Sequence, residues 1–239
     1  DRYEIATSSD GRWVAAVVCD GAGSAARADE GAQIVAKYFS EELIKLSTDI
    51  DKDGPGQWIN DRIIECVLEV RRRIRGVARQ DDLSEFHCTL VATLLSDAGG
   101  FAIQIGDGLI IGGKTQPDAY PEGDAISLDF ISKPENGEYV NETFFITEPR
   151  WLKHIRISPI SASCDWLMLA TDGGAAYLLD AHDDVLESNF RRFLESLLVM
   201  DLKSAQVEDV LNSKDILAVS SDDKTIVFVS KINWTRISE

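Results

Sequence analysis

The sequence predicts an α+β protein, with two mainly antiparallel sheets packed face to face and flanked by helix pairs in a four-layer α-β-β-α sandwich. Strand-like and helix-like segments do not alternate as in a parallel βαβ protein, because the strands are grouped in the middle of the chain and helices lie on both sides of that group. Hydrophobic residues make up 44% of the 239 residues, enough for one substantial core. With no long polar linker and no internal repeat, we expect a single domain over 1–239.

The first elements are a buried strand and two amphipathic helices. Residues 13–19 form an uncharged apolar run, typical of a strand covered on both faces. Apolar residues recur at helical spacing through 34–46, the Gly- and Pro-containing stretch 51–57 interrupts them, and a second stripe follows through 58–77. We interpret the other face of the second helix as solvated rather than phosphate-binding. That face carries Arg71, Arg72, Arg73, Arg75 and Arg79.

From residue 87 the pattern changes to strands. Residues 87–96 and 100–113 are strand-like, and the hairpin signal Asp97-Ala98-Gly99-Gly100 separates them. The later predicted elements are a loop over 115–124, strands over 125–131 and 143–148 around a turn at Asn136-Gly137, a strand over 166–171, helices over 185–200 and 205–211 with Ser204 as N-cap, and a strand over 225–229.

Composition excludes several classes of protein. The formal net charge of −17 would repel nucleic-acid phosphates, although simple solubility explains the acidity equally well. No apolar stretch approaches the roughly 20 residues needed to span a bilayer. The scattered cysteines are expected to be reduced core thiols of a cytoplasmic protein, and the histidines are too isolated for a zinc site. These residues are Cys19, Cys66, Cys88, Cys164, His87, His154 and His182. Because the first residue is Asp rather than Met, we expect part of the native N-terminus to be missing.

Three apolar strand-like runs end in Asp-Gly, at Asp20, Asp107 and Asp172, and Asp222 directly precedes the last strand-like run. A single Asp-Gly is most simply a turn, but three that each follow an apolar run suggest that the aspartates belong to one site. Carboxylates held at the ends of buried strands and converging on one rim would bind hard divalent cations, which prefer oxygen ligands.

Two divalent cations at such a rim would suit hydrolysis of a phosphate ester by activated water, with no protein nucleophile. Motifs for other reactions are absent from the sequence. There is no G-x-S-x-G nucleophile elbow, no G-x-x-x-x-G-K-[ST] phosphate loop and no dinucleotide fingerprint before a helix.

In chain order, the segments VVCDGAGSA, CTLVATLL, IQIGDG, LMLATDGG and SDDKTIVFV resemble the motifs of the protein phosphatase 2C family of metal-dependent serine/threonine phosphatases. The resemblance spans nearly the whole chain and points to a divergent bacterial branch. It implies two Mn²⁺ or Mg²⁺ ions, or three. Asp20 would bridge two ions, and the Gly21 carbonyl would bind one of them. Asp172 and Asp222 would complete the protein ligands of the other ion. Asp107 would hold a third ion, more weakly bound.

The resemblance also implies that Asp1 is the acid of the family's N-terminal motif, acting through metal-bound water. The implied catalytic set is Asp1, Asp20, Asp172 and Asp222. Two positions depart from the pattern: Ala22 replaces a histidine proposed to assist the leaving group, and Asp223 replaces an asparagine. The family's phosphate-binding arginine would lie upstream of this chain; Arg2 or Arg27 could take its place, but we expect both to be surface residues.

We therefore expect a cytoplasmic, monomeric phosphatase that acts on phosphorylated proteins made by a serine/threonine kinase, with no nucleic-acid or membrane partner. One alternative is a pseudophosphatase, a phosphoprotein-binding or regulatory module on the same fold, which Ala22 favours and the retained acids oppose. A hydrolase of small phosphate esters is another.

Overall fold

The computed structural model of the chain describes residues 1–116, 126–135, 143–175, 178, 191–195, 204–214 and 222–231. Its elements are β1 (Arg2–Thr7), β2 (Val14–Cys19), α1 (Ala28–Asp53), α2 (Ile59–Ala78), η1 (Ser84–Phe86), β3 (Leu90–Ser96), β4 (Gly99–Ile105), β5 (Leu109–Gly113), β6 (Phe130–Ser132), η3 (Trp151–Lys153), β7 (Arg156–Ile160), β8 (Trp166–Ala170), α3 (Asp172–Ala175), α5 (Ser204–Leu211) and β9 (Ile226–Ser230).

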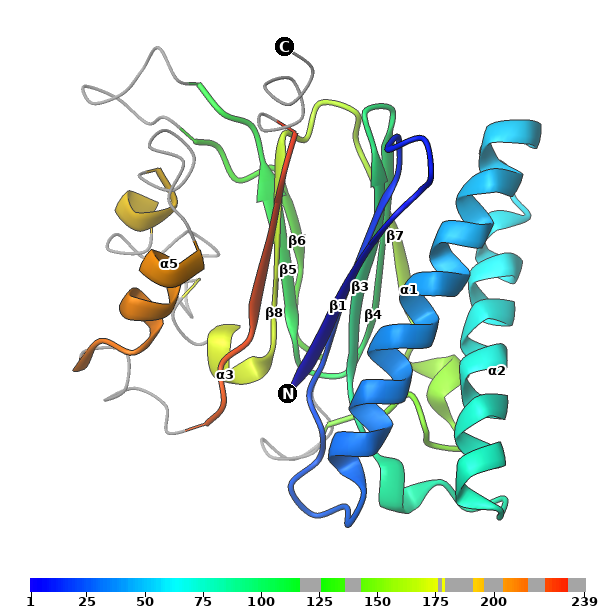
Figure 1. Ribbon diagram of the computed structural model, residues 1–239. Helices are drawn as coiled ribbons and strands as arrows, with labels where there is room; N and C mark the ends of the chain where they lie inside the picture. Colours follow the sequence, from blue (N-terminus) through cyan, green and yellow to red (C-terminus); the bar gives the residue numbers. More distant parts are fainter. Residues whose placement is uncertain are drawn as a thin grey trace.

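The strands form two wholly antiparallel sheets, which confirms the predicted fold class. One sheet has the order β1-β2-β3-β4-β7 and the other the order β6-β5-β8-β9. Figure 1 shows the two sheets side by side, with α1 and α2 covering the outer face of the first and α5 beyond the second. Residues 191–195 are also helical, and Leu194 packs on the outer face of the second sheet.

Strand β2 explains why the first apolar run contains no polar residue. All six of its residues are buried. Ala15, Val17 and Cys19 face the helices, whereas the alternate residues such as Ala16 and Val18 face the second sheet. A strand covered on both faces has no solvent side on which a polar residue would be tolerated.

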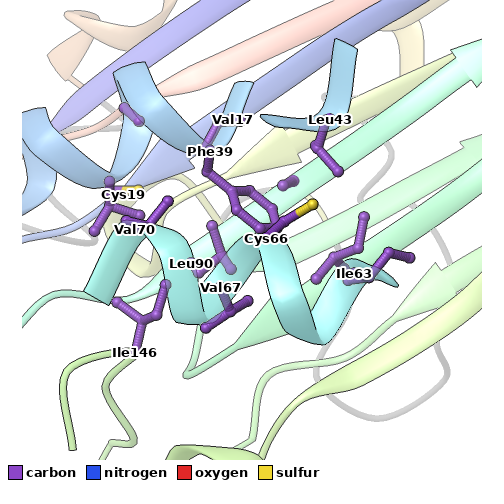
Figure 2. Close-up of a cluster of buried hydrophobic side chains, with 14 of the residues drawn as sticks. Val17, Cys19, Phe39, Leu43, Ile63, Cys66, Val67, Val70, Leu90 and Ile146 are labelled. Carbon is purple, nitrogen blue, oxygen red and sulfur yellow. The ribbon is translucent and has the colours of Figure 1, made fainter. Parts of the chain in front are cut away.

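The two long helices pack their apolar stripes on the first sheet. Phe39 and Leu43 from α1 meet Ile63 and Val67 from α2 above the strand residue Leu90, and all five are fully buried (Figure 2). Burying an aliphatic or aromatic side chain of this size contributes about 1.5–3 kcal/mol. This cluster fixes the helix pair on the sheet.

Helix α1 is longer than predicted, but it ends at the predicted breaker. It stops at Asp53, and Gly54, with φ of 73°, donates its N–H to the Ile50 carbonyl. A positive φ favours glycine, so this turn ends the helix at low cost.

Two strands of the first sheet, β1 and β7, have no counterpart in the sequence prediction. Both lie at sheet edges. In β1 five of six residues are exposed, and β7 contains Pro159 and has only Ile160 buried. An edge strand lacks the two covered faces that produce a continuous apolar run, and it tolerates proline.

The predicted strand over 143–148 is wrong. Phe144 stacks on His154 with ring centroids 3.5 Å apart, and Phe145 stacks on His87 at 4.8 Å. These residues therefore bury their rings against histidines in an irregular segment rather than in a sheet. The same contacts identify the two histidines as packing residues.

Several smaller predictions can be compared directly. All four cysteines are free and buried, as expected.

Of the predicted strand over 125–131, only the C-terminal end forms a strand, as part of β6. The Asn136-Gly137 turn, His182, most of the loop over 115–124 and most of the helix over 185–200 lie outside the described residues. None of the helices that the structure describes has the length and apolar character that crossing a bilayer demands.

Arg71 corrects the interpretation of the arginine face. Unlike the exposed Arg72, it is only 6% accessible, and its guanidinium donates to the Ile146 carbonyl and lies 5.7 Å from the Trp151 ring. Burial, together with Arg75, lowers the pKa of Arg71 to about 10. Helical spacing assigned it to the polar face, but segment 143–155 covers that part of the helix.

We predict that Arg71→Ala lowers the free energy of unfolding by about 2–4 kcal/mol, because it removes buried packing and leaves the Ile146 carbonyl unpaired. The matched variant Arg72→Ala removes a 64%-exposed side chain paired with Glu69. It should change stability by less than about 0.5 kcal/mol. Urea denaturation measures both, and equal losses would contradict the anchoring role of Arg71.

Candidate active site

The strand registers bring the five predicted acidic positions to one end of the sandwich. In the first sheet Arg2 pairs with Cys19, so Asp1 and Asp20 lie at the same end. In the second sheet Ala170 pairs with both Leu109 and Ile226, so the chain around Asp107, Asp172 and Asp222 meets at one end as well. Figure 1 places the N-terminus beside α3 at this end.

Asp20 is held through its main chain by Thr89. The Asp20 N–H donates to the Thr89 hydroxyl at 3.0 Å, and the Thr89 N–H donates to the Asp20 carbonyl at 2.8 Å. Thr89 is only 1% accessible. Gly21 follows in a bridge with Cys88, and a Cβ on Gly21 would lie 3.0 Å from Ala28 at the start of α1. The turn after β2 is therefore fixed against both the neighbouring strand and the helix.

Asp107 lies in the three-residue turn that carries the chain from β4 in one sheet to β5 in the other. Gly106 has φ of 102°, and a Cβ there would lie 2.8 Å from Thr89 Cγ2. A Cβ on Gly108 would lie 2.8 Å from the Ala170 carbonyl oxygen. The turn thus fits between the supports of Asp20 and Asp172 only because both flanking residues are glycine.

A buried glutamine braces this turn. Gln104 is inaccessible to solvent, and its side-chain amide donates to the Gly108 carbonyl. Its side-chain oxygen accepts a hydrogen bond from Ser132 at 2.5 Å. A polar side chain inside the sandwich is tolerated because both of its ends are bonded.

Asp172 and Asp222 are brought together by the pairing of β8 with β9. A Cβ on Gly173 would lie 2.1 Å from the Asp223 carbonyl oxygen and 3.3 Å from Asp222 Cβ. The second residue of the Asp172-Gly173 pair therefore has to be glycine for the last strand to approach. Asp172 and Asp222 each accept a hydrogen bond from the next residue's N–H, at 2.6 and 2.9 Å.

Asp1 joins the site through a side chain of the second sheet. The Thr171 hydroxyl donates to Asp1 Oδ2 at 3.0 Å. Thr171 immediately precedes Asp172 and is 1% accessible. Sequence reasoning missed Thr171, although its position beside a strand-end aspartate was visible.

The carboxylates interact electrostatically across the end of the sandwich. Burial raises the pKa of Asp20 to about 7, with further contributions from the charges of Asp172, Asp222 and Asp107. Burial likewise raises the pKa of Asp172, and so does the charge of Asp107. Burial raises the pKa of Asp107, with Asp222 adding to the shift. Half-buried like charges that disfavour one another's ionisation favour either protonation or a bound cation.

These donors fit divalent cations chemically, since they are oxygen ligands on rigid strand ends that repel one another. Over the residues that the structure describes, however, no three acidic, histidine or cysteine side chains stand close enough to form a complete cation site.

The two arginines considered for phosphate binding are engaged elsewhere. Arg2 pairs with Asp29 at 2.6 Å. Arg27 pairs with Glu30 at 2.8 Å and lies 4.2 Å from the centre of the Phe86 ring. Both therefore make contacts around the start of α1, in agreement with a structural role.

The model of the family described as protein phosphatase 2C matches residues 1–212. This chain belongs to the protein phosphatase 2C family. Within the curated proteins it is 26% identical over 218 residues to serine/threonine-protein phosphatase 3 of Escherichia coli strain K12, covering 87% of this chain and 80% of that protein. The predicted family resemblance is thus confirmed.

Solved bacterial phosphatases share the fold. A bacterial serine phosphatase superposes with a TM-score of 0.59 at 14% identity, covering 96% of this chain and 90% of its own. The serine/threonine phosphatase Stp1 of Staphylococcus aureus gives 0.55 at 14% identity, covering 95% and 86%. At this identity the likeness supports the protein phosphatase 2C fold alone.

We predict that Asp20→Asn stabilises the metal-free protein above pH 7. Folding raises the pKa of Asp20 from its ordinary 3.8 to about 7, so the folded state retains a proton that the unfolded state has lost between these values. Stability should therefore fall as pH rises through this window, and the variant should escape that fall. Thermal unfolding in EDTA should show a gain of a few degrees at pH 8 that disappears near pH 4.

Asp81→Asn, which alters a fully exposed carboxylate, is the matched control and should show no such gain. An equal gain for Asp20→Asn at pH 4 and pH 8 would argue against charge repulsion as its cause.

Proposed function

We propose that the chain is a metal-dependent phosphatase that removes phosphate from phosphoserine and phosphothreonine in proteins. The observation that supports this proposal best is the convergence of Asp20, Asp107, Asp172 and Asp222 where the strands of both sheets end. Membership of the protein phosphatase 2C family supports the reaction, and the phosphatase of Escherichia coli supports the choice of substrate.

In this proposal Asp20, the Gly21 carbonyl, Asp172 and Asp222 hold two Mn²⁺ or Mg²⁺ ions, and Asp107 holds a third. Divalent cations at such a site neutralise phosphate charge and make water acidic enough to attack near neutral pH. Short connections to the strand ends would keep the four carboxylates together, because Asp20 directly follows β2, Asp107 lies in the three-residue turn between β4 and β5, and Gly173 packs against the chain at Asp222.

Asp1 is the proposed proton acceptor. Thr171 occupies its Oδ2, which leaves Oδ1 to accept a hydrogen bond from the attacking water. Ala22 has no titratable group, so the side chain at that position does not protonate the leaving oxygen. Departure of the serine or threonine oxygen therefore depends on a proton from solvent or from another residue.

We further propose one catalytic domain over 1–239, acting as a monomer in the cytoplasm on the products of a serine/threonine kinase. The acidic surface, with a net charge of −17, disfavours nucleic acid as a partner. Hydrolysis of phosphopeptides and nucleotides, compared side by side, tests the preference for proteins over small phosphate esters.

We predict that Asp172→Ala lowers manganese-stimulated hydrolysis of an aryl phosphate by at least about 100-fold, because it removes a proposed metal ligand. The protein should remain folded in the same buffer, as judged by circular dichroism. Asp61→Ala, an exposed acid in the first turn of α2, is the control and should keep normal activity. Wild-type rates in Asp172→Ala would refute the assigned site.

A pseudophosphatase is the second candidate. Ala22, which stands where the family resemblance implies a histidine, favours it. We predict that calorimetry detects Mn²⁺ binding that Asp172→Ala weakens at least about tenfold. Binding together with turnover supports the enzyme. Binding without turnover supports the pseudophosphatase, and failure to bind manganese would contradict both.

A further inference from the structure

Thr171 makes a side-chain bond that no catalytic assignment explains. Its hydroxyl lies 3.0 Å from Asp1 Oδ2, although 170 positions separate the two residues in the chain. Thr171 follows β8 in the four-stranded sheet, whereas Asp1 precedes β1 in the five-stranded sheet. The bond therefore crosses from one sheet to the other at the candidate active site.

The direction of this bond is fixed by a second partner. The Thr225 N–H donates to the same Thr171 hydroxyl at 3.1 Å. A hydroxyl has one hydrogen, and because its lone pair already accepts from Thr225, that hydrogen is free to point at the Asp1 carboxylate. A bond from a hydroxyl to an ionised carboxylate is stronger than one between neutral groups.

The main chain of Thr171 is equally constrained. Its N–H donates to the Thr225 carbonyl at 3.1 Å, so Thr171 and Thr225 are joined by two bonds just before β9 begins. With 1% accessibility, the side chain has no alternative partner in solvent. Thr171 thus contacts Asp1 directly, precedes Asp172 in the chain, and is bonded to Thr225, which lies three residues after Asp222.

We propose that Thr171 is a positioning residue, whose hydroxyl orients the Asp1 carboxylate relative to the metal-binding carboxylates. This inference rests on the proposed function, in which Asp1 accepts a hydrogen bond from the attacking water. With Oδ2 held by Thr171, rotation of the carboxylate is restricted and Oδ1 keeps one orientation. The hydroxyl contributes through Asp1 and does not itself contact the substrate.

A double-mutant cycle between Thr171 and Asp1 tests this role in the full chain. Thr171→Val keeps the shape of the side chain and removes the hydroxyl, whereas Thr171→Ser keeps the hydroxyl. We expect Thr171→Val to lower kcat/KM for an aryl phosphate roughly tenfold and Thr171→Ser to stay within roughly twofold. In an Asp1→Ala background, Thr171→Val should change kcat/KM by less than roughly twofold. Equal losses in both backgrounds would overturn the proposal, because Thr171 would then act only through Thr225.

Thr93→Val provides the matched control. Thr93 is also a fully buried strand threonine, and its hydroxyl donates to the Phe101 carbonyl at 3.1 Å, away from the site. We expect this variant to lower the melting temperature by about 2–4 °C, as Thr171→Val does, while kcat/KM stays within about twofold of wild type. Equal activity losses for the two valine variants would assign Thr171 a purely structural role.

Thermal unfolding in EDTA gives a readout that does not depend on activity. The drop in melting temperature caused by Thr171→Val should be smaller in the Asp1→Ala background, because the bond to Asp1 is already absent. If the wild type hydrolyses no substrate with manganese, the proposed function fails, and this thermal cycle alone decides whether Thr171 holds Asp1. Additive temperature shifts would overturn the positioning role.

Discussion

The packing of one sheet against the other is the constraint on which the rest of the molecule depends. The inner faces meet through apolar side chains such as Val18 from β2 and Leu169 from β8. An ionised carboxylate between them would be costly unless paired, so acids are tolerated only where the strands end. Antiparallel pairing in both sheets then determines which strand ends share an edge, and it is this pairing that gathers five distant aspartates.

The same arrangement lowers the stability of the fold at the proposed site. Asp20 reaches a pKa of about 7 because burial and neighbouring carboxylates disfavour its charge. A chain selected for stability alone would replace at least one of these acids with a neutral residue. Their presence at the ends of well-packed strands is the pattern expected of a functional site, where unfavourable local interactions are offset by the surrounding core.

The sequence indicated the centre of the site better than its surroundings. Asp20 and Asp172 could be recognised because each follows a strand buried on both faces, and such strands are continuous apolar runs. Strands β1 and β7 could not be recognised, because edge strands do not form continuous apolar runs. Arg71 was misassigned because helical spacing separates two faces of a helix but does not show which distant segment covers part of the polar face. The Thr171 bond depends on a contact across 170 positions, which no local pattern reveals.

The late position of Asp222 in the chain has a consequence for biosynthesis. Helices α1 and α2 and strands β1 to β4 all lie within the first 105 residues, so most of the first sheet and its helix layer can assemble while the rest is being translated. Strand β9 begins only at Ile226 and pairs with β8. The acidic edge is therefore completed only after the first sheet and its helices have been translated, and a nascent chain that lacks β9 cannot hold the full set of carboxylates together.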